Sequence, residues 1–254
     1  MLIDTHIHHE FGTTNTATFV QRAERGLTDH FWVSTLKGGY YPSPADIRLS
    51  NDAVHVLMQR LPAHVVGFCY VNPVHGSLAV DELRQRVEQQ GFRGVKLWVA
   101  TYADDPRVDS IVEAAAAYGI PLLVHCWVKV GGQSVSGGNL PFESTPMHLG
   151  RLARRHPKAR FIMAHLGGDW EYGVRVARDC PNISVDTSGS LAERDSIESL
   201  VDAVGIERVL FGTDNSDLDF CLGKIVGADL TDDQREAILW RNAARLLDLS
   251  SSTR

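Results

Sequence analysis

The sequence predicts an α/β protein in which eight parallel strands close into a (β/α)₈ barrel, the TIM-barrel architecture. Short apolar, β-branched runs recur along the 254 residues, and helix-like stretches separate them. Their spacing averages about 30 residues, the size of one strand-plus-helix unit. No linker or change of composition divides the chain, so residues 1–254 are expected to form a single barrel domain. The predicted strands are 2–7, 31–36, 65–71, 93–98, 121–126, 160–165, 182–186 and 208–212.

The segments between the strands carry signals of helix ends. Thr231 and Gln234 have the spacing of a capping box and predict the start of the last helix. An open, doubly wound sheet is the alternative to a barrel, but no G-x-G-x-x-G follows an early strand, so dinucleotide binding has no support. Glycine favours the left-handed conformation that ends many helices, and it closes amphipathic segments at Gly26, Gly91, Gly119 and Gly205.

Composition narrows the classes of partner. The formal net charge is −6, which opposes binding to nucleic acid or an anionic membrane and favours a small-molecule substrate, while leaving a homo-oligomer open. Four widely spaced cysteines form no C-x-x-C pair and predict reduced thiols. The sequence begins without a basic and then apolar leader, and its most apolar stretch, 114–128, is broken by Gly119 and Pro121. A cytoplasmic location is expected.

Polar residues stand where the predicted strands end, and in barrels of this type catalytic side chains lie at the C-terminal ends of strands. His6 and His8 are two residues apart on a strand, so both side chains point to one face and can reach a single ion. The motif predicts half of a metal site. The other strand ends contribute Lys96, His125, His165 and Asp214.

Each of these residues also has an ordinary structural interpretation. A single histidine is often a hydrogen-bonded core residue, Asp214 suits a turn or a helix cap, and Lys96 suits an ion pair at the barrel rim. These interpretations do not explain why several separate strands end in residues that can bind metals. Imidazole together with carboxylate suits zinc, manganese or iron.

Seven segments together resemble the amidohydrolase superfamily, and more closely its amidohydrolase-related branch, which includes aminocarboxymuconate-semialdehyde decarboxylase-like enzymes. They follow the family order along nearly the whole chain. The segments are "DTHIH" at 4–8, "GFRGVKLW" at 91–98, "PLLVHC" at 121–126, "FIMAHLGG" at 161–168, "NISVDTSG" at 182–189, "RVLFGTD" at 208–214 and "NAARLL" at 242–247.

The resemblance implies a barrel with a bound metal. We expect one divalent ion, zinc first and manganese or iron as alternatives. The resemblance also implies that the metal is held by His6, His8, His125 and Asp214, with His165 close by as a catalytic group or a ligand to a second metal. The chain is shorter than many members, and "FGTDNSD" lacks the proline common after that aspartate. Both departures bear on the substrate.

Three functions follow as hypotheses. The first is metal-dependent hydrolysis of a C–N or C–O bond in a small amide, ester or lactone, in which Asp214 accepts a proton from water and His165 hydrogen-bonds the carbonyl. The second is metal-dependent, non-oxidative decarboxylation of a small carboxylic acid. The third is a metal-binding barrel without catalysis, although structural zinc sites are usually closed.

Residues after the strands give hints about the substrate. Lys37, Arg48 and Trp127 could present cations and an aromatic face to a planar acidic molecule, although solvated surface residues would look the same. Residues 128–143 form a long connection and are expected to act as a lid.

The number of metals depends on Lys96. In binuclear members of the superfamily a lysine at the end of this strand is carboxylated and bridges two metals. An ammonium group has no lone pair for a metal. Because the surrounding motifs match the branch with one metal, we expect a mononuclear site in which Lys96 is unmodified, near the substrate or in a rim ion pair.

Overall fold

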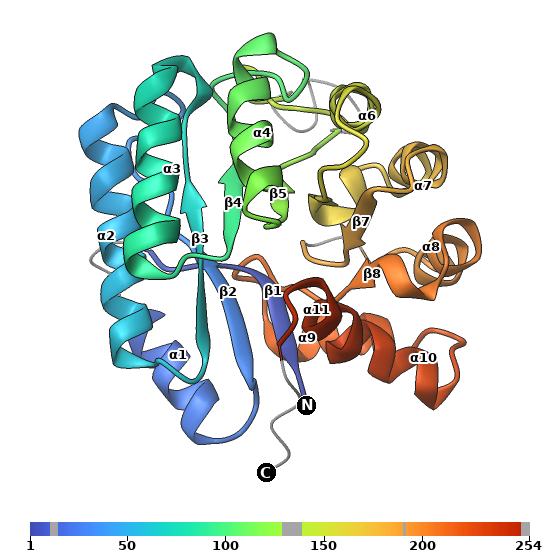
Figure 1. The fold of residues 1–254 in the computed structure, drawn as a ribbon. Helices are drawn as coiled ribbons and strands as arrows, with labels where there is room; N and C mark the ends of the chain where they lie inside the picture. The colour runs from blue at the N-terminus through green and yellow to red at the C-terminus, as the bar shows by residue number, and fades with distance from the viewer. Residues whose placement is uncertain (11–14, 129–138, 190–191, 250–254) are drawn as a thin grey trace.

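The computed structural model describes residues 1–10, 15–128, 139–189 and 192–249. Eight parallel strands lie in sequence order, each hydrogen-bonded to the next, and helices surround them (Figure 1). The predicted strands are confirmed, with ends shifted by up to two residues. They are β1 (Ile3–His8), β2 (His30–Ser34), β3 (Val65–Tyr70), β4 (Gly94–Leu97), β5 (Leu122–Val124), β6 (Phe161–Met163), β7 (Ile183–Asp186) and β8 (Val209–Leu210).

The segment that follows β8 returns to β1 and completes the ring. The backbone N–H of Thr5 donates to the carbonyl of Phe211 at 2.9 Å, and that of Thr213 donates to the carbonyl of His6 at 3.2 Å. These bonds connect the two ends of the sheet. The fold is therefore a (β/α)₈ barrel, as predicted, and the alternative of an open sheet is wrong.

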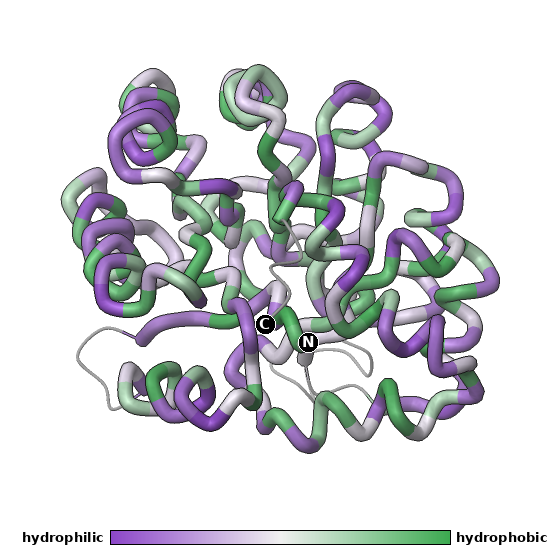
Figure 2. Tube along the Cα trace, turned by 60° about the horizontal axis from the view of Figure 1, so that its bottom comes forward, coloured by the Kyte–Doolittle hydropathy of each residue, from purple (hydrophilic) through white to green (hydrophobic). Residues whose placement is uncertain are grey.

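The helices start and end where the sequence places its signals. Gly91 ends α3 in the left-handed conformation with φ of 73°, and a capping box between Thr231 and Gln234 starts α10. The outer helical turns alternate between hydrophilic and hydrophobic residues (Figure 2). The helices are α1 (Asn15–Glu24), α2 (Pro44–Arg60), α3 (Ser77–Gln90), α4 (Asp109–Ala117), α6 (Pro146–Arg155), α7 (Trp170–Asp179), α8 (Ser196–Val204), α9 (Leu218–Val226), α10 (Asp232–Glu236) and α11 (Asn242–Leu246).

Short helical turns complete the described elements. They are η1 (Pro73–His75), η2 (Pro106–Val108), η3 (Ala164–Gly167), η4 (Ile206–Arg208) and η5 (Ala237–Arg241).

The apolar core consists of two clusters of buried residues. The larger packs the outward side chains of the strands against the helices, and the smaller joins inward side chains such as Ile3, Trp32 and Leu123 to Ala243 and Leu247 in the α11 region. The rings of Trp32 and Phe68 stack with centroids 5.2 Å apart. The lower barrel is thus a packed apolar layer, and the polar residues lie above it.

A register shift in β1 decides which of its side chains face inward. Pairing with β2 is irregular between Asp4 and Ile7. Ile3 belongs to the inner cluster and Ile7 to the outer one, although a regular strand would place residues four apart on the same face. The irregularity acts as a β-bulge and turns His6 inward.

Several further expectations can be placed on the structure. The four cysteines are free thiols, as predicted, and all four are buried. Within the described residues, none of the helices combines the length and apolar character needed to cross a membrane. Most of the loop predicted as a lid, residues 129–138, lies outside the described residues.

Candidate metal centre

Three potential ligand atoms from two strand ends face one another at the top of the barrel. The Nε2 atoms of His6 and His8 are 3.3 Å apart. Oδ1 of Asp214 lies 3.4 Å from the first and 3.1 Å from the second. All three atoms carry lone pairs, and a cation between them would satisfy all of them at once. The prediction that one ion could reach both histidines agrees with this geometry.

The other two predicted histidines border this group. His165 Nε2 lies 3.7 Å from Oδ2 of Asp214 and 3.3 Å from Nδ1 of His125. The structure thus brings His6, His8, His125, His165 and Asp214 into one continuous set.

Each of the four histidines is held by a partner on the side of the ring that faces away from this set. Such outer contacts fix the ring orientation and decide which nitrogen keeps its lone pair. The partners are Asp186 for His6 at 3.0 Å, the Ser34 hydroxyl for His8 at 3.0 Å, Glu143 for His125 at 2.8 Å and the Ser188 hydroxyl for His165 at 2.9 Å.

Asp186 and Ser188 connect two of these rings. The Ser188 hydroxyl donates to Oδ1 of Asp186 at 2.5 Å, so its oxygen accepts a hydrogen bond from Nδ1 of His165. Oδ2 of Asp186 accepts from Nδ1 of His6. These partners assign the ring hydrogens of His6 and His165 to Nδ1, which leaves both Nε2 lone pairs directed at the central set.

Burial keeps these rings neutral. It lowers the pKa of His6 to about 4 and the pKa of His165 well below its usual value. A neutral imidazole is the form that binds a metal. At Asp214, burial works to raise the pKa, but the neighbouring His6 and His165 outweigh it and the pKa falls.

Lys96 is fully buried and its Nζ lies 2.8 Å from Nε2 of His6. Burial lowers the pKa of this amine to about 8. The expected alternative of an ion pair at the rim is wrong, because the side chain points inward from β4 to a histidine.

The backbone at two of these residues is also unusual. His165 and Asp214 have φ of 58° and 50°, in the left-handed region. His165 was predicted as the last residue of a strand, but β6 ends at Met163 and the chain turns into η3. Gly189 leaves room for the displaced ring, since a Cβ there would lie 3.2 Å from Nδ1 of His165.

The three weaker candidates for substrate binding differ in how near they lie to the histidines. The Trp127 ring lies edge-on to His165, with centroids 5.3 Å apart. Lys37 lines a cavity of 470 Å³ together with His8. Arg48 is exposed on α2, and its carbonyl accepts a hydrogen bond from Arg86. The structure brings Trp127 and Lys37 to the site and does not bring Arg48 there.

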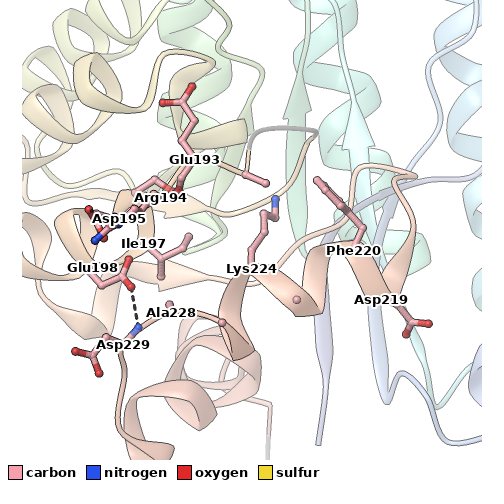
Figure 3. A pocket seen from close by; sticks show the side chains of 14 residues that line it. Glu193, Arg194, Asp195, Ile197, Glu198, Asp219, Phe220, Lys224, Ala228 and Asp229 are labelled. Carbon is pink, nitrogen blue, oxygen red and sulfur yellow. Dashed lines mark hydrogen bonds and ion pairs between the residues drawn. The ribbon is translucent and has the colours of Figure 1, made fainter.

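A larger cavity of 710 Å³ lies between the start of α8 and helix α9 (Figure 3), and none of these histidines is among its lining residues. Lys224 lines it and donates to the carbonyls of Thr187 and Gly189, at 2.5 and 3.0 Å. These two residues flank Ser188. The cavity wall therefore supports the segment that orients His165.

Sequence reasoning missed Asp186, Ser188 and Glu143 as site residues. The first two lie in "NISVDTSG", which was recognised only as part of the family pattern. A carboxylate at the end of a buried strand is a signal of the same kind as the strand-end histidines. Glu143 gave no comparable signal, because it lies in an irregular segment.

The donor set fits a divalent metal. Two imidazole nitrogens, from His6 and His8, and one carboxylate oxygen, from Asp214, converge, and the His125 and His165 rings lie beside them. Nitrogen and oxygen donors of this kind suit zinc, manganese or iron.

Comparison with known proteins finds chains of similar structure. Three solved structures are similar to the chain over nearly their whole length. A Staphylococcus aureus protein described as an amidohydrolase shares 18% identity, covering 98% of this chain and 99% of that one, with a TM-score of 0.79. A 2,6-dihydroxybenzoate decarboxylase from Rhizobium shares 16%, covering 98% of each chain, with a TM-score of 0.79. A dihydroxybenzoic acid decarboxylase from Polaromonas, with bound manganese and 2-nitroresorcinol, shares 17%, covering 98% and 97%, with a TM-score of 0.76.

These likenesses support the fold. The model of one family, described as amidohydrolase, matches residues 37–249, most of the chain, and this chain belongs to the amidohydrolase family.

Proposed function

We propose that this chain is a metal-dependent enzyme that removes the carboxyl group of a small aromatic acid without oxidation. The convergence of His6, His8 and Asp214 within 3.1–3.4 Å carries the proposal of a metal enzyme. Similar structures that are decarboxylases of dihydroxybenzoic acids favour this reaction over hydrolysis. The substrate class we propose is a hydroxybenzoate.

The hydrogen-bond partners of His165 define the state of its ring before reaction. Hydrolysis assigns this residue a donor role, in which a ring N–H stabilises the oxyanion. In the structure Nδ1 is bonded to Ser188, so Nε2 of the neutral ring is an acceptor. In this state Nε2 can take up a proton and deliver it later, as decarboxylation requires.

The bound metal would supply a positive charge that orients the substrate oxygens and stabilises negative charge on them. His165 and Asp214 would hold the proton that the reaction consumes. Because the pKa of each is lowered, either group is a strong acid once it carries a proton. The carbon–carbon bond breaks, its electron pair stays on the ring carbon, carbon dioxide leaves, and the proton bonds to that carbon.

The remaining contacts suit a flat anionic molecule. Trp127 packs against His165 and offers an aromatic edge beside the reacting groups. Lys37 lines the cavity next to His8 and offers a cation for a ring hydroxyl or carboxylate. We propose these two residues as substrate contacts.

The experiment is a panel of mono- and dihydroxybenzoates incubated with the protein loaded with zinc, manganese or iron, with carbon dioxide and the phenolic product measured together. Equal amounts of both products are expected, and chelation should abolish them. His165→Asn should lower kcat by about 10²–10⁴. Asp179→Asn, a change on the exposed end of α7, is the matched control.

Hydrolysis is the second candidate, favoured by the position of Asp214 beside both histidine nitrogens, where it could accept a proton from water. Amides, esters and lactones of the same aromatic acids belong in the panel. Turnover of these compounds without carbon dioxide release would replace the decarboxylase proposal. Turnover that survives complete chelation would overturn both.

A further inference from the structure

Lys96 makes a contact that the proposed reaction does not use. Its Nζ is 2.8 Å from Nε2 of His6, the atom proposed to bind the metal, and the side chain is completely buried. An amine at this distance donates a hydrogen bond to the ring nitrogen. The contact is therefore made to the lone pair that a metal would need.

His6 has no second lone pair to offer. Nδ1 carries the ring hydrogen, because Asp186 accepts from it at 3.0 Å. Nε2 consequently has one lone pair, which either accepts from Lys96 or binds a metal. The two partners exclude each other at this atom.

We propose that Lys96 competes with the metal for His6, so that its amine leaves this ring when the metal binds. The inference rests on the proposed function for the existence of the metal site. Lys96 holds the His6 ring in position while no metal is bound, and its displacement opposes metal binding. It therefore acts as a positioning residue that weakens the affinity for metal.

The opposite role predicts the opposite result. A Lys96 side chain that had gained carbon dioxide would be a ligand, and its loss would weaken metal binding. A competitor, in contrast, makes binding tighter when it is removed. Lys96→Met distinguishes the two, because methionine has a similar length, suits a buried position and has no N–H to donate.

The first measurement is the dissociation constant for zinc and for manganese, obtained by chelator competition with the whole protein. Lys96→Met should bind each ion roughly tenfold more tightly than the wild type, as expected for the loss of one competing hydrogen bond from a charged group, about 1.4 kcal/mol. Lys158→Met removes a lysine from an exposed turn and should leave the constant unchanged.

The second measurement is thermal unfolding with and without metal. The rise in Tm on adding metal should be larger for Lys96→Met than for the wild type, because a ligand stabilises the folded state according to its affinity. Unchanged or weaker binding in this variant overturns the inference and leaves the proposed function standing. A wild type that binds no divalent metal overturns both.

A third measurement remains decisive if the variant fails to fold. Crystal structures of the wild type with and without metal should show Nζ of Lys96 within hydrogen-bond distance of Nε2 of His6 only in the metal-free protein. Persistence of that contact in the metal-loaded protein, or density for a carboxylated Lys96, would refute competition.

Discussion

Asp186→Asn tests how the site is held in place without replacing a proposed metal ligand. The carboxylate is completely buried and accepts hydrogen bonds on both oxygens. Oδ2 accepts from Nδ1 of the His6 ring at 3.0 Å. Oδ1 accepts from the Ser188 hydroxyl at 2.5 Å and from two backbone N–H groups, that of Ser188 at 2.9 Å and that of His165 at 3.0 Å. All of these partners are donors.

An asparagine amide can accept on one side only, so its NH₂ group must face a donor on the other. Oδ1 has the larger number of donors, and we expect the amide oxygen to take that place. The NH₂ group then faces Nδ1 of His6, which must give up its hydrogen and accept instead. The ring hydrogen moves to Nε2, the atom proposed to bind the metal.

The expected consequence is a folded protein that has lost metal affinity. Loss of a partner behind a metal-binding histidine typically costs about 10–100-fold in affinity. The less favourable buried network should lower the free energy of unfolding by about 1–3 kcal/mol. For a chain of this length, each kcal/mol lowers Tm by roughly 2–4 °C.

Chelator competition measures the affinity, and thermal unfolding of the chelated protein measures the stability. The control is again Asp179→Asn, because Asp179 lies on the exposed surface and pairs with Arg178. A variant that binds metal as tightly as the wild type would show that Asp186 does not set the state of the His6 ring. The reasoning would then be refuted.

Three further predictions follow from buried groups. The first concerns the pH dependence of stability in the metal-free protein: His6 of the unfolded chain takes up a proton below its usual pKa of 6.5, whereas folded His6 stays neutral down to about 4. The free energy of unfolding should therefore keep its full value above pH about 6.5 and fall by on the order of 3 kcal/mol as the pH is lowered to about 4. Urea denaturation at pH about 7 and about 4.5 checks this, and equal free energies of unfolding at the two pH values contradict it. The second concerns packing: Gly173→Ala would push a Cβ into the carbonyl oxygen of Leu166, next to His165, and should lower the free energy of unfolding by about 1–3 kcal/mol. In the control Gly223→Ala the added Cβ meets no atom and should not lower it, and thermal scans that do not separate the two variants reject the packing argument. All four thiols are buried, and burial raises the pKa of Cys221 to about 11, so a thiol reagent should modify the cysteines at the rate of unfolding; rapid labelling of the native protein is the contrary outcome.

The fold could be predicted from the sequence because each strand-plus-helix unit carries its own signal. Apolar β-branched runs mark strands such as 65–71, and terminal residues such as Gly91 mark helix ends. These signals are local, and the order of parallel strands follows from their repetition. Closure of the ring depends on bonds from Thr5 to the segment after β8, which no local pattern reveals.

The candidate site could be predicted only where a side chain stands at a strand end. The orientation of His6 depends on the register shift in β1, and strict alternation from the inward-facing Ile3 would have turned this ring outward. The turn of the chain at His165 and the contact of Lys96 with His6 arise from packing between distant segments. Glu143 is 18 residues from His125 in the sequence, and no local pattern pairs the two.

Metal content per chain is the measurement that tests the central claim most directly. Inductively coupled plasma mass spectrometry on the purified wild type should find one divalent ion per chain, and none on His8→Ala or Asp214→Ala, since each removes one of three converging ligands. Intact mass should show Lys96 unmodified. Metal retained in both variants, or a wild type that takes up no divalent ion when it is supplied, would contradict the assignment of this site.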